Sequence, residues 1–294
     1  ALTMNYADNK PMVIVESNYY GCSISRNPYN ADAVRAEGWW FMLAGGAGDI
    51  NLNGGREARQ RLASLADYFL MHDRPIEMRC DDSVTRSGVA AAMILRRSRG
   101  FAPDPLRLPF EIQPILATGA ELKNTFCVAR QRYAFLSHHI GDLENYPALQ
   151  AFESGIQHYQ RLFRVQPEAI AYDLHPDYLA TRYALQRAEA EQIPAVGIQH
   201  HHAHIAACMA ENGLPSGEQV IGVAWDGTGY GDDGAIWGSE FLLASYPAYR
   251  RIAHLTYVPL PGGDLAARQP WRMALAWLHK SGIPWEGDLA PVQF

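Results

Sequence analysis

The sequence predicts an α/β fold with a largely parallel core between residues 105 and 294. Short apolar runs alternate there with longer stretches whose apolar residues follow the spacing of an amphipathic helix. Strands that alternate with helices are typical of sheets in which neighbouring strands run parallel. The sequence shows no internal repeat and no low-complexity tract, so we expect neither a repeat array nor a long disordered segment.

The alternation can be followed element by element. Apolar runs predict strands at residues 115–117, 169–172, 195–198 and 220–225. Helical spacing predicts helices at residues 148–165, 179–190 and about 202–212. Gly213 directly follows the last of these helices and is a typical helix-ending residue.

Composition excludes several classes of protein. The 294 residues are 48% hydrophobic and have a net charge of -6 without a long basic run, which argues against binding nucleic acid through phosphate contacts. No apolar run approaches the roughly 20 residues that span a bilayer, and residues 1–4 lack signal-peptide features. The four cysteines are far apart, without a Cys-x-x-Cys pair. We therefore expect a cytoplasmic protein with no membrane or nucleic-acid partner.

Three regions of the chain differ in composition and in sequence pattern. Residues 1–56 are rich in Asn, Gly and Tyr and are predicted to be a separate segment. Residues 57–104 begin with a helix pattern and end near Pro103 and Pro105, which resemble a linker. Residues 105–294 contain the alternating strands and helices, so we predict domain boundaries near residues 56 and 104.

Four histidines stand where a predicted strand is followed by a helix. They are His200, His201, His202 and His204. His200 and His204 are four residues apart and share a helix face, as in paired histidines that bind one zinc or iron ion. His201 replaces the glutamate of the peptidase motif, which argues against a metallopeptidase. A cluster of hydrogen-bonded histidines capping the helix is the alternative, and we favour the metal.

A glycine-rich loop follows the predicted strand 220–225. It reads Asp226-Gly227-Thr228-Gly229-Tyr230-Gly231, and a second apolar stretch comes after it. The backbone N–H groups of such a turn can bind a phosphate, and Asp226 at the strand end could hold a metal or a water. An ordinary glycine-rich hairpin is the alternative.

Four other features have simpler interpretations. Residues 121–125 could present Lys123 to a phosphate, and residues 173–178 follow another predicted strand. For both stretches, the spacing alone favours a solvated loop. Residues 96–100 form a basic cluster, which is either a phosphate clamp or a solvated edge strand. Glu16 ends an apolar run, and one carboxylate without a partner does not indicate a glycosidase.

Together, many of these phrases resemble the HypF family of hydrogenase-maturation carbamoyltransferases. The resemblance runs from about residue 57 to residue 294. The matching phrases are LMHDRPI (70–76), RCDDSV (79–84), LRRSRGFAP (95–103), GAELKNTF (119–126), IGDLEN (140–145), DLHPDY (173–178), QHHHAHIAACMAENG (199–213), DGTGYG (226–231), LPGGD (260–264) and PWRMA (270–274). So many matching sequence motifs in one order are specific to a family.

The resemblance implies an activity and a fold. Proteins like HypF make carbamoyl adenylate from carbamoyl phosphate and ATP in a YrdC-like domain. They pass the carbamoyl group to the C-terminal cysteine of HypE, where it becomes the cyanide ligand of nickel–iron hydrogenases. The transfer domain resembles tRNA threonylcarbamoyl transferases and has an actin-like, duplicated ribonuclease-H-type fold.

The family's site residues carry over onto matching positions. His200 and His204 correspond to metal ligands, for zinc or iron, and Asp226 and Lys123 to catalytic groups. Magnesium is a further candidate ion beside ATP. The nucleotide-binding positions are Asn124, Gly227, Thr228, Gly229 and Gly231.

The sequence departs from the family in three ways. The acylphosphatase-like domain, the cysteine zinc fingers and most of the YrdC-like domain have no counterpart, so residues 57–104 are expected to be the tail of that domain. The second lobe of the transfer domain is expected to be truncated. Residues 1–56 faintly resemble late strands of a glycoside-hydrolase barrel, with Glu16 at a strand end. An inactive scaffold that retains only metal and partner binding is therefore the alternative to an active carbamoyltransferase.

Overall fold

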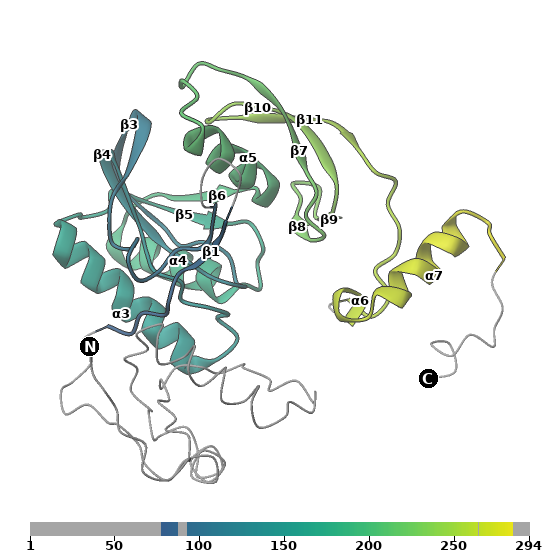
Figure 1. Cartoon of the computed structure of the whole chain (residues 1–294), viewed down its shortest axis with the longest axis horizontal. Helices are drawn as coiled ribbons and strands as arrows, with labels where there is room; N and C mark the ends of the chain where they lie inside the picture. Colours follow the sequence, from purple (N-terminus) through teal and green to yellow (C-terminus); the bar gives the residue numbers. More distant parts are fainter. Residues whose placement is uncertain (1–77, 88–92, 264, 285–294) are drawn as a thin grey trace, which may run out of the picture. The chain divides into compact units, whose positions relative to one another are not determined.

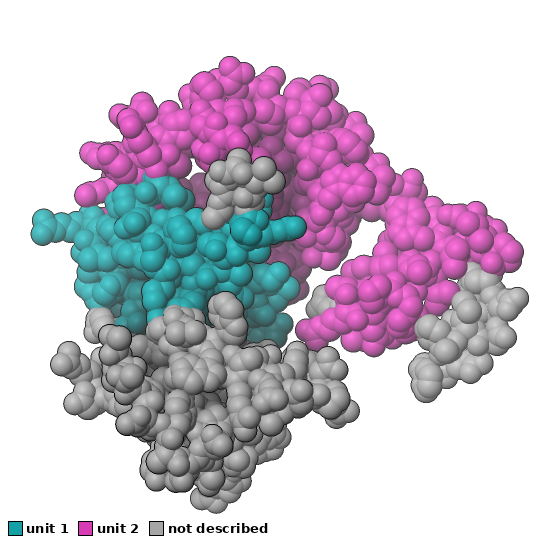
Figure 2. Space-filling view, in the orientation of Figure 1, with its two compact units in different colours: residues 1–106, 122–128, 135–164 teal, residues 107–121, 129–134, 165–294 magenta. Residues whose placement is uncertain are grey.

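The computed structural model describes residues 78–87, 93–263 and 265–284 (Figure 1). The predicted segment 1–56, with Glu16, and the helix pattern that begins near residue 57 lie outside these residues. No described helix is long and apolar enough to cross a membrane. The chain divides into two compact units, which Figure 2 colours separately. Unit 1 contains residues 1–106, 122–128 and 135–164, and unit 2 contains residues 107–121, 129–134 and 165–294. The domain boundaries predicted near residues 56 and 104 stay predictions.

The helix α3 (Tyr146–Phe163) dominates the described part of unit 1. Asn145 caps its N-terminus, because the side-chain oxygen accepts a hydrogen bond from the backbone N–H of Ala148 at 3.0 Å. Arg164 ends the helix in the left-handed conformation, with φ 52°. The helix predicted at 148–165 is therefore confirmed, with each end two residues earlier.

The buried face of α3 packs on aromatic side chains. Phe126 meets Phe152 and Tyr159 edge-on, with ring centroids 6.0 and 5.1 Å apart. Gly155 is required here, since a Cβ would lie 2.9 Å from the Phe126 ring. Unit 1 also contains an antiparallel pair, β1 (Val84–Arg86) and β2 (Met93–Arg96).

A four-stranded sheet has the order β4-β3-β5-β6. Its strands are β3 (Leu106–Ala117), β4 (Cys127–Leu136), β5 (Ala169–Asp173) and β6 (Ala195–Ile198). β3, β5 and β6 run parallel, which confirms the predicted strands near residues 115, 169 and 195. Sequence patterns did not predict β4. The register pairs Ala117 with Ala171 and Asp173 with Ile198, so the carboxyl ends of these strands lie at one edge.

Two helices connect to this parallel group. The first, α4 (Leu179–Glu191), joins β5 to β6 and ends at Gln192 with φ 55°. The second, α5 (His200–Glu211), begins directly after β6. The side-chain oxygen of Gln199 accepts a hydrogen bond from the N–H of His202 at 2.9 Å, so the helix starts two residues earlier than predicted.

A second sheet has the order β11-β10-β7 and is antiparallel throughout. Its strands are β7 (Val220–Ala224), β10 (Glu240–Ala244) and β11 (Tyr249–His254). The prediction of a largely parallel core is therefore wrong for this sheet, because no helix separates these strands in sequence. Between β7 and β10 lies a small hairpin of β8 (Gly229–Tyr230) and β9 (Ile236–Trp237). Two further helices follow, α6 (Leu265–Arg268) and α7 (Pro270–Lys280).

Helix α5 covers one face of the second sheet (Figure 1). Ile205 and Met209 of the helix join Ala224 and Leu242 in a buried core. Gly222 in β7 allows the close approach, because a Cβ there would overlap the side chain of Ile205. The helix that begins at His200 is thereby fixed against the strand that leads to Asp226.

The buried His138 of unit 1 gives the folded protein a pH dependence. Its side chain is 3% exposed. Burial, with the nearby charges of Arg79, His139 and His158, lowers the pKa of His138 to about 4. The unfolded chain then binds this proton more readily than the folded chain. Stability is retained above about pH 6.5 and falls as the pH drops toward 4.

We expect the free energy of unfolding to fall by about 2 kcal/mol between pH 7 and pH 5 through His138 alone. Urea denaturation of wild type and His138→Gln at the two pH values measures this contribution as their difference. The exposed His279 serves as a control, since His279→Gln should keep the wild-type dependence. Identical pH profiles for wild type and His138→Gln would contradict the assignment.

Candidate functional site

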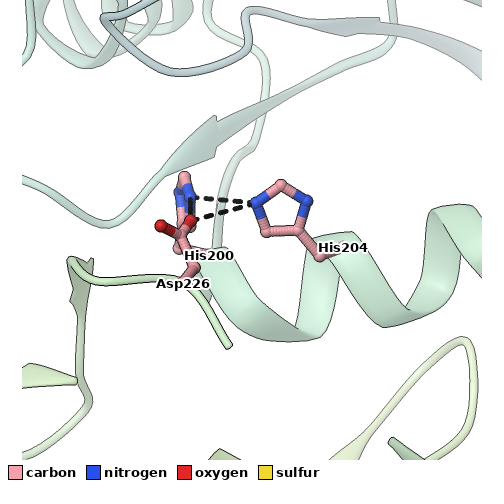
Figure 3. A group of neighbouring side chains, drawn as sticks. All are labelled: His200, His204 and Asp226. Atoms are coloured by element: carbon pink, nitrogen blue, oxygen red, sulfur yellow. Dashed lines mark hydrogen bonds and ion pairs between the residues drawn. The ribbon is translucent and has the colours of Figure 1, made fainter. Parts of the chain in front are cut away.

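The first turn of α5 presents two histidines side by side. His200 is the first helical residue and His204 follows four positions later, so both imidazoles project from one face. Their Nε2 atoms are 3.2 Å apart (Figure 3). The predicted pairing of these histidines on one face is therefore confirmed.

Asp226 completes a group of three. It lies two residues after β7, and its Oδ2 is 2.9 Å from Nε2 of His200 and 3.3 Å from Nε2 of His204 (Figure 3). One ligand atom from each side chain lies within 4.8 Å of the others. Within the described residues, no other three His, Cys, Asp or Glu side chains were found in such an arrangement.

These distances fit a divalent metal. A tetrahedral ion bound about 2.0–2.1 Å from each nitrogen or oxygen would separate its ligand atoms by about 3.3 Å. The three observed separations run from 2.9 to 3.3 Å. Two imidazole nitrogens and one carboxylate suit zinc or iron, and three protein ligands leave a position open for a substrate.

A second carboxylate contacts the other side of His200. Asp173 is the last residue of β5, is 8% exposed, and places Oδ2 2.6 Å from Nδ1 of His200. Sequence reasoning interpreted residues 173–178 as a solvated loop, and that is wrong for Asp173. Its position at the end of an apolar run, like that of Gln199 after β6, is the signal in the sequence that could have identified it.

The two carboxylates control the charge of this group. Hydrogen bonds to Asp173 and then to Asp226 raise the pKa of His200 to about 9, against the opposing effect of burial. The same contacts, first with His200 and then with His204, hold the pKa of Asp226 well below its usual range. Near neutral pH the carboxylate of Asp226 is therefore ionised and lies beside the protonated imidazole of His200.

The other two histidines have structural positions. His201 is fully buried, and a Cβ added to Gly229 would lie 2.7 Å from its ring. His202 is also buried, with Nε2 2.7 Å from the backbone oxygen of Ser245. The alternative of hydrogen-bonded structural histidines thus describes His202, whereas His200 and His204 face Asp226.

The glycine-rich loop divides into an exposed part and a packed part. Gly227 and Thr228 are exposed, and a Cβ at Gly227 would meet no atom within 4 Å. Gly229 and Gly231 are buried, and the N–H of Gly231 donates to the oxygen of Ala235 at 2.9 Å. The loop is thus partly the glycine-rich hairpin of the alternative interpretation, and its role in nucleotide binding stays a prediction.

A pocket of about 310 Å³ lies at the carboxyl edge of the parallel strands. Half of its lining residues are alanine or glycine, and both histidines line it. The lining residues are Ala117, Gly119, Ala120, Ala171, Tyr172, Asp173, Ile198, His200, Ala203 and His204. Ligands of α/β sheets commonly bind at this edge, so the pocket and the three ligand atoms form one candidate site.

Lys123 and Asn124 belong to unit 1, whereas the histidines and Asp226 belong to unit 2. Lys123 is exposed, with φ 51°, and its backbone N–H donates to Asp142 Oδ1 at 2.7 Å. Asn124 is 2% exposed, and its backbone pairs with Gly141. Their predicted catalytic and nucleotide-binding roles stay predictions.

The basic cluster at residues 96–100 is tied to the backbone around it. Arg97 donates to the oxygens of Phe101 and Asp104 at 2.7 and 2.8 Å. Arg99 donates to the oxygen of Cys80 at 3.0 Å. These contacts hold a turn together, and the choice between a phosphate clamp and a solvated edge strand stays open for the cluster.

Substitutions of two loop glycines should distinguish a glycine in a packed position from one that faces open space. A Cβ at Gly231 would overlap the indole of Trp237, so Gly231→Ala should lower the free energy of unfolding by about 1–3 kcal/mol. Gly227→Ala, in open space, should change it by less than about 0.5 kcal/mol. Urea denaturation measures both, and equal effects would show that Gly231 is not a packing position.

Family profiles and known proteins match most of this region. Residues 111–211 match the HypF Kae1-like domain, and residues 222–293 match the second subdomain of the carbamoyltransferase Kae1-like domain. The chain is 48% identical over 238 residues to carbamoyltransferase HypF2 of Cupriavidus necator, covering 80% of this chain and 29% of that protein. It is 45% identical over 276 residues to carbamoyltransferase HypF of Rhodobacter capsulatus, covering 92% of this chain and 37% of that protein.

Solved structures agree with the sequence matches. A full-length HypF, crystallised in a phosphate- and nucleotide-bound form, matches with TM-score 0.68 and 49% identity over 76% of this chain and 34% of that chain. HypF of T. kodakarensis matches with TM-score 0.69 and 43% identity over 76% of this chain and 29% of that chain. The predicted α/β fold of the actin-like, ribonuclease-H type is thereby confirmed. The chain spans about a third of the length of the proteins it matches.

Proposed function

This chain belongs to the HypF family, and from that premise we propose that it is a carbamoyl-transfer region with a divalent metal at its centre. The observation that supports this proposal most directly is the convergence of His200, His204 and Asp226 beside the pocket. As in the family it belongs to, the carbamoyl donor would be carbamoyl adenylate, formed from ATP and carbamoyl phosphate.

His200, His204 and Asp226 would hold the ion, with zinc or iron as the candidates and magnesium as the companion of ATP. A bound divalent ion would act as a Lewis acid that withdraws charge from an oxygen of the donor. The small side chains of the pocket leave room for the donor beside the two histidines. The exposed backbone at Gly227 and Thr228 could bind its phosphate.

The proposed acceptor is the C-terminal cysteine of a HypE-like protein, in the maturation of nickel–iron hydrogenases. The acceptor sulfur forms a bond to the carbamoyl carbon, the bond from that carbon to the phosphate oxygen breaks, and AMP leaves. The thiol proton passes to solvent or to a neighbouring base. Conversion of the transferred carbamoyl group to the cyanide ligand would follow elsewhere, and we expect this chain and its acceptor protein in the cytoplasm.

Removing the paired imidazoles should abolish metal binding. We expect the wild-type chain to bind one zinc or iron ion, and His200→Ala with His204→Ala to bind it at least about 100-fold more weakly, because two of three protein ligands are lost. Equilibrium dialysis followed by elemental analysis measures both. His279→Ala, which removes an exposed histidine, should bind like wild type. Equal metal content in wild type and the double variant would contradict the proposed centre.

The transfer step can be tested with the donor supplied directly. The chain is incubated with carbamoyl adenylate and a HypE-like acceptor, and mass spectrometry detects a carbamoyl group on the acceptor cysteine. We expect transfer by wild type and none by the His200→Ala, His204→Ala variant or to an acceptor without that cysteine. Metal binding without transfer would instead favour the inactive scaffold, an alternative consistent with the partial coverage of the relatives.

A further inference from the structure

We propose that Asp173 is a positioning residue that orients His200 for metal binding. The inference rests on the proposed metal centre and adds to it a residue that is not a ligand. Asp173 contacts Nδ1 of His200, on the opposite side of the ring from the Nε2 that faces Asp226 and His204. It would act on the metal only through this imidazole.

The parallel register brings the two side chains together. Asp173 ends β5 and pairs with Ile198, which ends β6, and His200 follows two residues later. The carboxylate oxygen Oδ2 is 2.6 Å from Nδ1, a distance typical of a charge-assisted hydrogen bond. The pairing therefore depends on the sheet and not on a flexible loop.

Asp173 is itself held in place. Its Oδ1 accepts a hydrogen bond from the backbone N–H of His175 at 2.9 Å. Its backbone oxygen accepts one from the hydroxyl of Thr181 at 2.7 Å. The side chain is only 7% exposed, so water competes little for these contacts. Both carboxylate oxygens are thus engaged, and the one near His200 has little freedom to turn away.

This contact selects one tautomer of the neutral imidazole. A carboxylate accepts hydrogen bonds, so Nδ1 of His200 must carry the hydrogen at this short distance. The lone pair then lies on Nε2, which points toward Asp226 and His204. A metal ion needs that lone pair, and carboxylates that hold metal-binding histidines in this way strengthen binding.

Among the described residues, no side chain contacts Nδ1 of the second histidine. The side chain of His204 is 61% exposed, against 17% for His200. Its contacts within the described residues involve Nε2, with His200 and Asp226. His200 is therefore the preorganised ligand of the pair, and the effect of Asp173 should depend on the presence of His200.

Asp173→Asn is a suitable probe, because it keeps the shape of the side chain and converts the carboxylate to an amide, with an NH₂ group in place of one oxygen. That amide can donate a hydrogen bond to Nδ1, which favours the tautomer with the hydrogen on Nε2. We expect the Kd for zinc, measured by competition with a chelator, to rise about 10–100-fold. Asp177→Asn, which changes an exposed carboxylate four residues further along the chain, should leave the Kd unchanged.

A double-mutant cycle with His200→Ala shows whether the effect passes through the imidazole. In the His200→Ala background, adding Asp173→Asn should change the zinc Kd by no more than about twofold. An undiminished loss in that background would mean that Asp173 acts through the general fold, and it would overturn the proposal. An unchanged Kd for Asp173→Asn alone would overturn it as well.

A second readout does not need metal. Long-range ¹⁵N–¹H spectra of the metal-free chain at alkaline pH, where His200 is neutral, report which ring nitrogen carries the hydrogen. We expect hydrogen on Nδ1 in wild type and a shift toward Nε2 in Asp173→Asn. An unshifted tautomer would contradict the positioning role. If wild type bound no metal, the proposed function would fail, and these spectra would still decide whether Asp173 orients His200.

Discussion

The parallel pairing of β5 with β6 is the constraint on which the candidate site depends. Because Asp173 pairs with Ile198, both strands end at the same edge, and the cap formed by Gln199 starts α5 at once. His200 consequently lies against Asp173. A shift of one residue in the register would turn the carboxylate to the other face of the sheet and remove the contact.

Two faces of helix α5 make different contacts. His200 and His204 face the pocket and Asp226, whereas His201 packs against the β8–β9 hairpin and Ile205 against the second sheet. The helical spacing of four residues produces both pairs. Glycines at the contact positions let the second sheet and the hairpin approach the helix closely, since a side chain at Gly222 or Gly229 would collide with Ile205 or His201. The contacts that hold helix α5 against β7 therefore also position Asp226, which follows this strand.

The electrostatics of the site follow from its place at a helix N-terminus. α5 has no acidic residue in its first turn, and two carboxylates from other elements, Asp173 and Asp226, lie beside it instead. Negative charge is favourable at this end of a helix. The carboxylates also compensate for holding the basic His200 in a half-buried position. A divalent metal would add positive charge where two negative side chains already converge.

The sequence by itself determined the class of fold, the family, and the pair of histidines that lie together on one helix face. Apolar runs predicted most of β5 and all of β6 and β7. The spacing of His200 and His204 is a local property that a helix converts directly into a shared face. The tertiary structure alone identified Asp173 as the support of His200, since strand pairing joins residues 27 positions apart. It also showed that Gly229 and Gly231 are packing positions, because the rings they contact come from other parts of the chain. Periodicity reports what lies along one element, and contacts between elements depend on register and packing, which no single stretch of sequence contains.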